Sequence, residues 1–370
     1  MTTLKAVNAP SAAVNHMPTP NQLEALNRKL VNAKSARDVF GPGDVGEAFR
    51  GLSAICHPDR WPNNKLAEET FKLLGQWRRL GDTNSGKAAP PVSVVIASKT
   101  NQYVVDGPSI AGDLSDVHKA TDTNGKVVAI KVIRSPANND MGLNEATRLK
   151  WMQEEAPTKD APPMVHIPKL LDTFEIQQGP CKHRANVFEY FNGFTTWTSI
   201  LKIVRGLDAR DAAWMFNRML GALVVTHQAG LVHGGVVPTN FMIMPDDGDP
   251  DPSTIHNGKL VGWTHCVKVG ETIKTIIRNY KHFYPEDVMT KKPANPGMDI
   301  HMAAACMLQL LGGHTDPVSI PPPIMGLLKA CMLPPRHRTS DAFELFEEFN
   351  EILTKLYGPR KFRKFLMSKT

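Results

Sequence analysis

Apolar residues recur at helical spacing near the start of the chain. Three leucines fall on one face of a first predicted helix: Leu23, Leu26 and Leu30. A second helix is predicted to begin at Asp44, because aspartate can cap a helix N-terminus. Its inward positions follow the same spacing: Val45, Ala48, Phe49 and Leu52. It is expected to end before Pro58, since proline has no backbone donor and biases the preceding residue away from helix.

A third helix is predicted from about Lys65 to Leu80. Its inward positions are Ala67, Thr70, Phe71 and Leu74. Two amphipathic helices joined by a short polar loop form an antiparallel helical hairpin, and the residues at its tip face water. The first part of the chain is therefore expected to be a small all-α domain.

From about residue 103 the pattern changes to strands and turns. The dipeptide Asn124–Gly125 is a strong hairpin signal, and residues 127–133 (VVAIKVI) predict a strand that carries one lysine, Lys131. That lysine either extends from a sheet edge to water or is an interior charge that needs an anion or a carboxylate. A carboxylate follows on a predicted helix, at Glu145. That helix is indicated by Leu143, Ala146 and Leu149.

The rest of the chain is rich in helices, so the fold class is α+β. The expected divisions are a disordered lead-in at 1–20, the helical domain at 21–82, a linker and leading strand at 83–99, a large domain at 100–355 and a basic tail at 356–370. The linker is indicated by the Gly/Ser/Pro-rich stretch GDTNSGKAAPP at 81–91.

Composition narrows the classes of function. Hydrophobic residues make up 42% of the chain and charged residues 21%, which suits globular domains, and the net charge of +7 is only mildly basic. A nucleic-acid partner is therefore not the favoured interpretation of the charge. The chain has 5 widely spaced cysteines, no apolar run of membrane-spanning length and no secretory leader pattern. A reducing cytoplasmic location without a membrane span or a metal site is expected.

The loop between the second and third helices reads His57–Pro58–Asp59. With the flanking segments DVFG, AFR and AEETFKLL, it resembles the J domain of heat-shock co-chaperones. In that family the tripeptide stimulates ATP hydrolysis by the seventy-kilodalton heat-shock chaperone. The resemblance makes that chaperone the expected partner, with Arg50 and Arg60 as the nearby cations. J domains usually carry more basic residues on the second helix, so electrostatic steering should be weaker here. The alternative is a plain helical hairpin whose loop reads HPD by chance.

The strand–Lys131–helix–Glu145 arrangement resembles the N-lobe of protein kinases, where this lysine binds phosphates and pairs with the glutamate. Of the three glycine positions in the family's glycine-rich loop, only Gly112 remains, because the others hold Ile110 and Ser115. The missing glycines weaken the backbone cradle for phosphates. ATP is the candidate nucleotide, with Gly112, Lys131, Glu145 and Asn240 as its candidate ligands.

The likeness continues in order through the large domain, giving an N-lobe at about 100–190 and a C-lobe at about 191–355. Four residues match positions that organise the kinase C-lobe: His233, Glu286, Asp299 and Arg338. In the family, the arginine pairs with the glutamate. These residues are expected to be structural whether or not the domain catalyses a reaction.

The chemistry that the family needs is missing from its two main positions. The segment HGGVVPTN keeps His233 and Asn240, but Gly235 stands where kinases have the catalytic aspartate, with Gly234 before it. Gly262–Trp263–Thr264 replaces the DFG triplet, whose aspartate binds magnesium. The residues therefore predict a pseudokinase without a magnesium site.

Three hypotheses follow. The favoured one is a J-domain co-chaperone whose pseudokinase domain binds a client, a partner or a nucleotide. The alternatives are a kinase-fold enzyme of atypical mechanism that transfers a phosphoryl or nucleotidyl group to protein, and a non-catalytic interaction scaffold with an inert tip. Two other charged stretches are interpreted as solvated: the acidic turn at Asp246, Asp247, Asp249 and Asp251, and the basic tail.

Overall fold

The chain forms two compact units, Met1–Val92 and Ser93–Thr370. The computed structural model describes residues 18–41, 45–57, 60–61, 64–84, 94–204, 206–246, 256–312 and 320–367. Asp44, Pro58, Asp59, Asp247, Asp249 and Asp251 lie outside those ranges. None of the helices within them combines the length and the apolar character that crossing a bilayer requires.

The N-terminal unit consists of α1 (Pro20–Asn32), α2 (Ala36–Phe40), α3 (Val45–Cys56) and α4 (Lys65–Asn84). Thr19 starts α1 with a capping box, because its hydroxyl accepts from the Gln22 backbone while the Gln22 side chain accepts from the Thr19 backbone at 2.8 Å. A second capping box, between Ser35 and Asp38, starts α2. α4 is longer than predicted and includes the first residues of the stretch interpreted as a linker.

The core of this unit contains the positions predicted for α1 and two of those predicted for α4, Ala67 and Leu74. The positions predicted for α3, and Phe71 of α4, are only partly buried against it. The buried members are Leu23, Leu26, Leu30, Ala36, Val39, Phe40, Cys56, Ala67 and Leu74. Two polar contacts fix α1 against α4: the Asn27 amide donates to the Thr70 hydroxyl at 2.8 Å, and the Trp77 indole donates to the Leu30 carbonyl at 2.9 Å. Thr70 is fully buried and is satisfied because its own hydroxyl donates to the Leu66 carbonyl.

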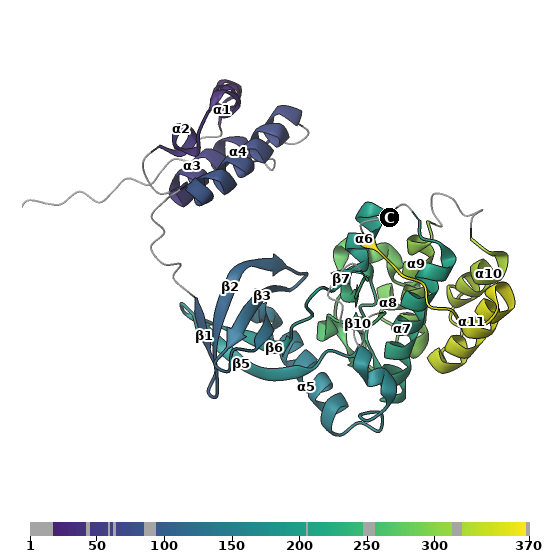
Figure 1. Ribbon diagram of the computed structural model, residues 1–370. Coiled ribbons are helices and arrows are strands. Elements are labelled where there is room, and N and C mark those ends of the chain that lie inside the picture. The colour runs from purple at the N-terminus through teal and green to yellow at the C-terminus, as the bar shows by residue number, and fades with distance from the viewer. Residues whose placement is uncertain are drawn as a thin grey trace, which may run out of the picture. The chain divides into compact units, whose positions relative to one another are not determined.

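The second unit begins with a six-stranded antiparallel sheet of order β1-β2-β3-β4-β6-β5 (Figure 1). Its strands are β1 (Val95–Ala97), β2 (Gln102–Ala111), β3 (Ser115–Asp122), β4 (Val127–Ile133), β5 (Leu170–Gln178) and β6 (Cys181–Glu189). The predicted strand over 127–133 is confirmed, and Gly125 makes the β3–β4 turn with a φ of 78°. Helix α5 (Asn139–Glu154) buries Ala146 and Leu149, whereas Leu143 is exposed.

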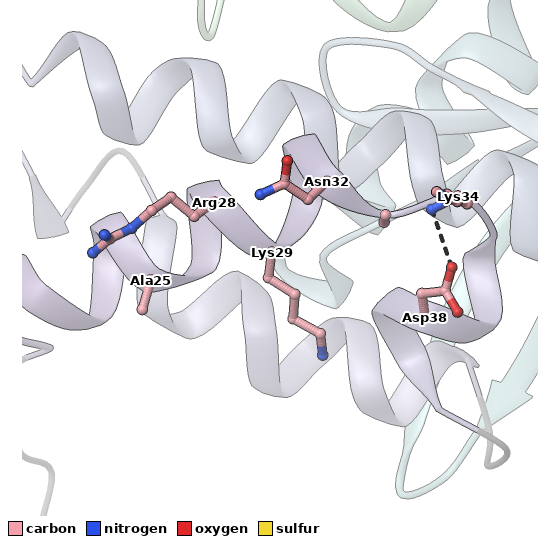
Figure 2. A pocket seen from close by; sticks show the side chains of 7 residues that line it. Ala25, Arg28, Lys29, Asn32, Lys34 and Asp38 are labelled. Carbon is pink, nitrogen blue, oxygen red and sulfur yellow. Dashed lines mark hydrogen bonds between the residues drawn. The ribbon is translucent and has the colours of Figure 1, made fainter.

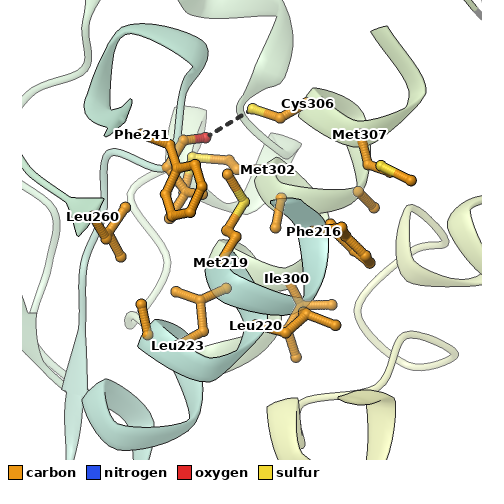
Figure 3. Packing of buried hydrophobic residues seen from close by; sticks show 14 of the residues in the cluster. Phe216, Met219, Leu220, Leu223, Phe241, Leu260, Ile300, Met302, Cys306 and Met307 are labelled. Atoms are coloured by element: carbon orange, nitrogen blue, oxygen red, sulfur yellow. Dashed lines mark hydrogen bonds between the residues drawn. The ribbon is translucent and has the colours of Figure 1, made fainter. Parts of the chain in front are cut away.

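The remainder is mainly helical. Its helices are α6 (Trp197–Ile203), α7 (Ala209–Gln228), α8 (Glu286–Met289), α9 (Pro296–Leu310), α10 (Pro322–Cys331) and α11 (Ala342–Tyr357). Short strands complete it: β7 (Thr195–Thr196), β8 (Leu231–Val232), β9 (Phe241–Ile243), β10 (Gly258–Leu260) and β11 (Val267–Lys268). Figure 3 shows the core, in which α7 supplies Phe216, Met219 and Leu220 and α9 supplies Ile300 and Met302. This core fixes the loops that make up the candidate site.

The C-terminal segment corrects one prediction. α11 ends at Tyr357, so the residues after Gly358 are not α-helical; most of the described ones are exposed as expected, but Phe365 is not. Phe365 is only 2% exposed, and its backbone N–H and carbonyl both bond to Asp246. Asp246 is accordingly a buried structural residue and not part of a solvated turn.

Candidate functional site

A buried ion pair links the sheet to α5. Lys131 Nζ lies 2.7 Å from Glu145 Oε1, and their side chains are 12% and 2% exposed. Glu145 also accepts from the Trp263 backbone N–H at 3.0 Å and from the Asn186 amide at 3.0 Å. The carboxylate is thus held by three donors from three segments, which is how a buried charge is satisfied.

Asn186 was not identified from the sequence. It lies on β6 directly opposite Lys131, and its amide also donates to the Gly142 carbonyl at 2.8 Å while its oxygen accepts from Thr173. The one feature that could have indicated Asn186 is that it is a polar residue within the buried run Ala185–Phe188. The partners of Asn186 depend on the pairing of β4 with β6, which the pattern of a single strand does not specify.

The segment 233–240 is held by Asp299 on α9. The fully buried Asp299 carboxylate accepts from the backbone N–H groups of His233 and Gly234, at 2.7 and 2.9 Å, and lies 3.1 Å from His227 Nε2. His233 is also fully buried, and its Nε2 bonds to the Val261 carbonyl. Its ring packs edge-on against Trp263. These contacts orient backbone and contribute no group that could transfer a proton to a substrate.

Asn240 occupies the space that a side chain at position 262 would need. Gly262 adopts a left-handed conformation, with a φ of 80°. A Cβ atom built there would lie 2.5 Å from both Cγ and Oδ1 of Asn240, too close for any real contact. The Asn240 amide donates to the Gly235 carbonyl at 2.9 Å, which fixes it in this place. An aspartate at 262 would therefore require Asn240 to move.

His265 lies over the two glycines of the loop. A Cβ atom on Gly234 would lie 2.6 Å from the His265 carbonyl oxygen, and Gly234 has a φ of 71°. At Gly235, a Cβ atom would make ordinary contacts with the His265 ring at 3.7 Å. The imidazole thus stands beside the position where the resemblance places the catalytic aspartate. The position of His265 beside the two glycines was not predicted.

The tip of the β2–β3 loop closes over His265. Asp113 Oδ2 lies 3.7 Å from His265 Nε2, and the Arg134 guanidinium donates to the carbonyls of Gly112 and Asp113. Burial raises the pKa of the Asp113 carboxyl, and the cations Arg134, Arg278 and Lys131 oppose that shift. The loop therefore brings a carboxyl group next to His265 and within reach of the charges of three cations.

Burial lowers the pKa of His265 to about 3 and that of His233 to about 4. An unfolded histidine has a pKa of about 6.5, so between that pH and the folded value the unfolded chain binds more protons. The free energy of unfolding should consequently fall as the pH is lowered, by about 2 kcal/mol per buried histidine from pH 7 to 5.

Urea unfolding at pH 7 and pH 5 tests this expectation. His265→Gln should lose part of the pH dependence, whereas the exposed control His282→Gln should keep all of it. Equal pH dependence in the wild type and in both variants would contradict the assignment.

The predicted pairing of Arg338 with Glu286 is wrong. Arg338 Nη2 donates to Asp287 Oδ2 at 2.5 Å, and Glu286 is exposed. α8 begins at Glu286, directly after Pro285, and this phase turns the second carboxylate of the helix inward. Arg338 does form a buried ion pair, but its partner is the carboxylate one residue after the predicted one.

At the helical hairpin, His57 directly follows α3, and its ring packs edge-on against Phe71 of α4 with the ring centroids 5.2 Å apart. Arg50 is exposed on α3, and Arg60 is half-buried. The other two residues of the predicted tip, Pro58 and Asp59, lie outside the described residues.

A shallow pocket of about 500 Å³ lies elsewhere on this unit, between α1 and α2 (Figure 2). It is lined by Ala25, Arg28, Lys29, Asn32, Ala33, Lys34 and Asp38. The Lys34 backbone donates to the Asp38 carboxylate at 3.0 Å, and the Lys29 ammonium donates to the Val39 carbonyl at 2.8 Å. Its lining is more basic than α3, where the resemblance places the docking cations.

Among the described residues, no group of three or more histidine, cysteine, aspartate or glutamate side chains is arranged to hold a metal ion. Asn240, the one candidate metal ligand retained in the catalytic-loop segment, bonds to backbone.

Comparisons with known proteins support the fold. No family model matches the chain. Serine/threonine-protein kinase PknL of Mycobacterium tuberculosis is 26% identical over 233 residues, which are 62% of this chain and 53% of that protein. Probable serine/threonine-protein kinase PknB of Bifidobacterium longum is 29% identical over 136 residues, or 36% of this chain and 19% of that protein. The chain thus spans about half or less of the length of these curated relatives.

A solved structure of vaccinia related kinase 3 superposes with a TM-score of 0.55 at 16% identity and covers 74% of this chain and 94% of its own. The chain therefore carries a protein-kinase-like domain with a β-rich sheet followed by helices.

Proposed function

We propose that the protein is a co-chaperone in which a helical unit recruits a seventy-kilodalton heat-shock chaperone and stimulates its ATPase, while a pseudokinase domain binds a client or partner. The pseudokinase part of the proposal is supported by the residues found at the two positions that kinases use for catalysis and metal binding. Positions 235 and 262 hold glycine, and His265 and Asn240 occupy the space beside them. The domain keeps its architecture but has no carboxylate at either position.

The size of the expected loss supports a non-catalytic role. A positioned general base contributes about 10²- to 10⁴-fold to a rate. Loss of the main metal ligand also removes neutralisation of charge on the transferred phosphoryl group. If the two effects are additive, the loss is of order 10⁵-fold or more. The Lys131–Glu145 pair cannot replace either function.

The loop tip also disfavours a triphosphate. Asp113 lies 3.7 Å from His265, and the charges of Arg134, Arg278 and Lys131 reach its carboxyl group. When this carboxyl is ionised, it would repel ATP phosphates that approach the same cations. Weak nucleotide binding that does not need a metal is the most that this arrangement supports.

The chaperone half of the proposal rests on the helical unit. Its α3 and α4 flank His57–Pro58–Asp59 in the order that the J-domain resemblance requires, and Phe71 packs against His57. A short turn with an imidazole, a fixed proline φ and a carboxylate suits docking to a protein surface better than chemistry on a small molecule.

The alternative is a kinase-fold enzyme of atypical mechanism. It is favoured by the relatives, which are named as kinases, and by the formed Lys131–Glu145 pair. A second alternative is a scaffold with an inert tip, which predicts neither ATPase stimulation nor nucleotide binding.

A thermal-shift titration tests the metal argument. We expect that any rise in melting temperature with ATP is not increased by magnesium, because positions 235 and 262 hold glycine in place of the carboxylates that serve catalysis and metal binding in kinases. Adenosine serves as the control ligand, since it lacks the phosphates that Asp113 would repel. A shift with ATP that requires magnesium would contradict the proposal.

A further inference from the structure

The C-terminal segment is fixed along the surface of the kinase-like domain. Arg363 forms a two-pronged ion pair with Asp211 of α7, at 2.8 and 3.0 Å, and Phe365 is buried two residues later. The backbone of Phe365 pairs with Asp246. These anchors hold the intervening backbone in place.

Three aromatic rings form a column beneath this segment. Trp214 of α7 stacks on His256 with centroids 4.3 Å apart and planes at 4°, and His256 stacks on Phe362 with centroids 4.6 Å apart and planes at 22°. Trp214 is 6% exposed and His256 is 8% exposed, but Phe362 is 67% exposed. The column therefore ends in an aromatic ring whose outer face is open to water.

Three exposed cations lie within two residues of that ring in the chain. Arg360, Lys361 and Lys364 are all exposed, and none of them forms an ion pair with a described carboxylate. The half-buried Arg218 places a further positive charge beside the column, since its guanidinium donates to the His256 carbonyl at 2.8 Å. Burial, together with the nearby Arg360, lowers the pKa of Arg218. We call Phe362 with Arg360, Lys361 and Lys364 the tail platform.

We propose that the tail platform binds single-stranded nucleic acid, with a base stacked on Phe362 and the backbone phosphates on the three cations. Exposed aromatic faces interleaved with cations are what sequence-tolerant single-strand binders present. The charge of the whole chain did not favour this partner, since it is only mildly basic. The local arrangement does, because the anchors at Arg363 and Phe365 fix the ring in advance.

An acidic membrane is the competing ligand for a basic segment with an aromatic residue. Insertion into a bilayer needs a continuous apolar face that can enter the headgroup region. Here a single ring lies flat on His256, and the described residues beside it in the chain are the cations Lys361 and Arg363. The geometry suits a flat, charged ligand better than a lipid surface.

The test is fluorescence anisotropy of the full chain with labelled oligouridylate and oligothymidylate of about fifteen nucleotides, within the site sizes of single-strand binders. Phe362→Ala should weaken binding about tenfold, because one stacked base is lost. Lys364→Ala should weaken it and reduce the salt dependence by roughly one phosphate contact. Phe343→Ala is the matched control, since Phe343 is 53% exposed but stands beside Glu344 on α11.

Binding that Phe362→Ala weakens and Phe343→Ala leaves unchanged would support the proposal. No binding of either oligonucleotide at low salt would overturn it, as would binding that is insensitive to Phe362→Ala. Binding to phosphatidylserine vesicles without binding to oligonucleotide would overturn it in favour of a membrane surface. None of these outcomes depends on the chaperone or on phosphoryl transfer.

Discussion

His57→Gln is expected to abolish the stimulation of a seventy-kilodalton heat-shock chaperone's ATPase by this protein. The proposed docking turn consists of three residues, and His57 contributes its only imidazole. Glutamine keeps a polar side chain but loses the ring that packs edge-on against Phe71. Because Phe71 packs against the helical core, unchanged thermal unfolding of the variant is the control that its fold is kept. Single-turnover hydrolysis of chaperone-bound ATP, with and without the protein, measures the effect.

Gln76→Ala is the matched control for that experiment. Gln76 is exposed on α4, eleven residues after its first residue Lys65 and so about 16 Å along the helix. It should leave stimulation intact. Stimulation that survives His57→Gln would refute the proposed role of the tip, and no stimulation by the wild-type protein would reduce the helical unit to a structural hairpin.

Local pattern was sufficient to predict the elements. The leucine spacing of α1, the buried face of α4 and the strand with Lys131 each reflect one element exposing one face to a core. The turn at Gly125 followed from its need for a positive φ. In each of these cases the residues that form the sequence pattern are also the ones that determine the element.

Partners distant in the chain were not predictable in this way. Asn186 reaches Glu145 only because β6 pairs with β4 in one register. Arg338 pairs with Asp287 and not with Glu286 because of the residue at which α8 begins. A sequence pattern locates a helix boundary only to within one or two residues.

The sequence indicated which catalytic and metal-binding residues of kinases are missing from the candidate site, but not which side chains lie in their place. Gly235 and Gly262 could be identified from the sequence alone. That Asn240 and His265 fill the adjoining space is a packing result, because it depends on where two separate loops meet. The same holds for Asp113, which reaches His265 from the opposite lobe.

Transfer of phosphate from ATP is the reaction that the proposed function does not include. If the effects of the two missing carboxylates are additive, the expected loss of order 10⁵-fold would bring a kinase of ordinary turnover, about 1–100 per second, to a background level. An aspartate restored at Gly262 alone would not help, since its Cβ would collide with Asn240. We therefore expect no difference in ATP consumption between the wild type and Lys131→Met.

The most direct test of the central claim is release of ADP, together with intact mass, after incubation of the full chain with ATP and either magnesium or manganese. Lys131→Met and Lys131→Arg are the comparison variants, the second because it keeps a cation beside the buried Glu145. The account predicts background ADP release and unchanged mass in all three proteins. ADP release or phosphate addition by the wild type that both variants lack would contradict it and establish a kinase-fold enzyme.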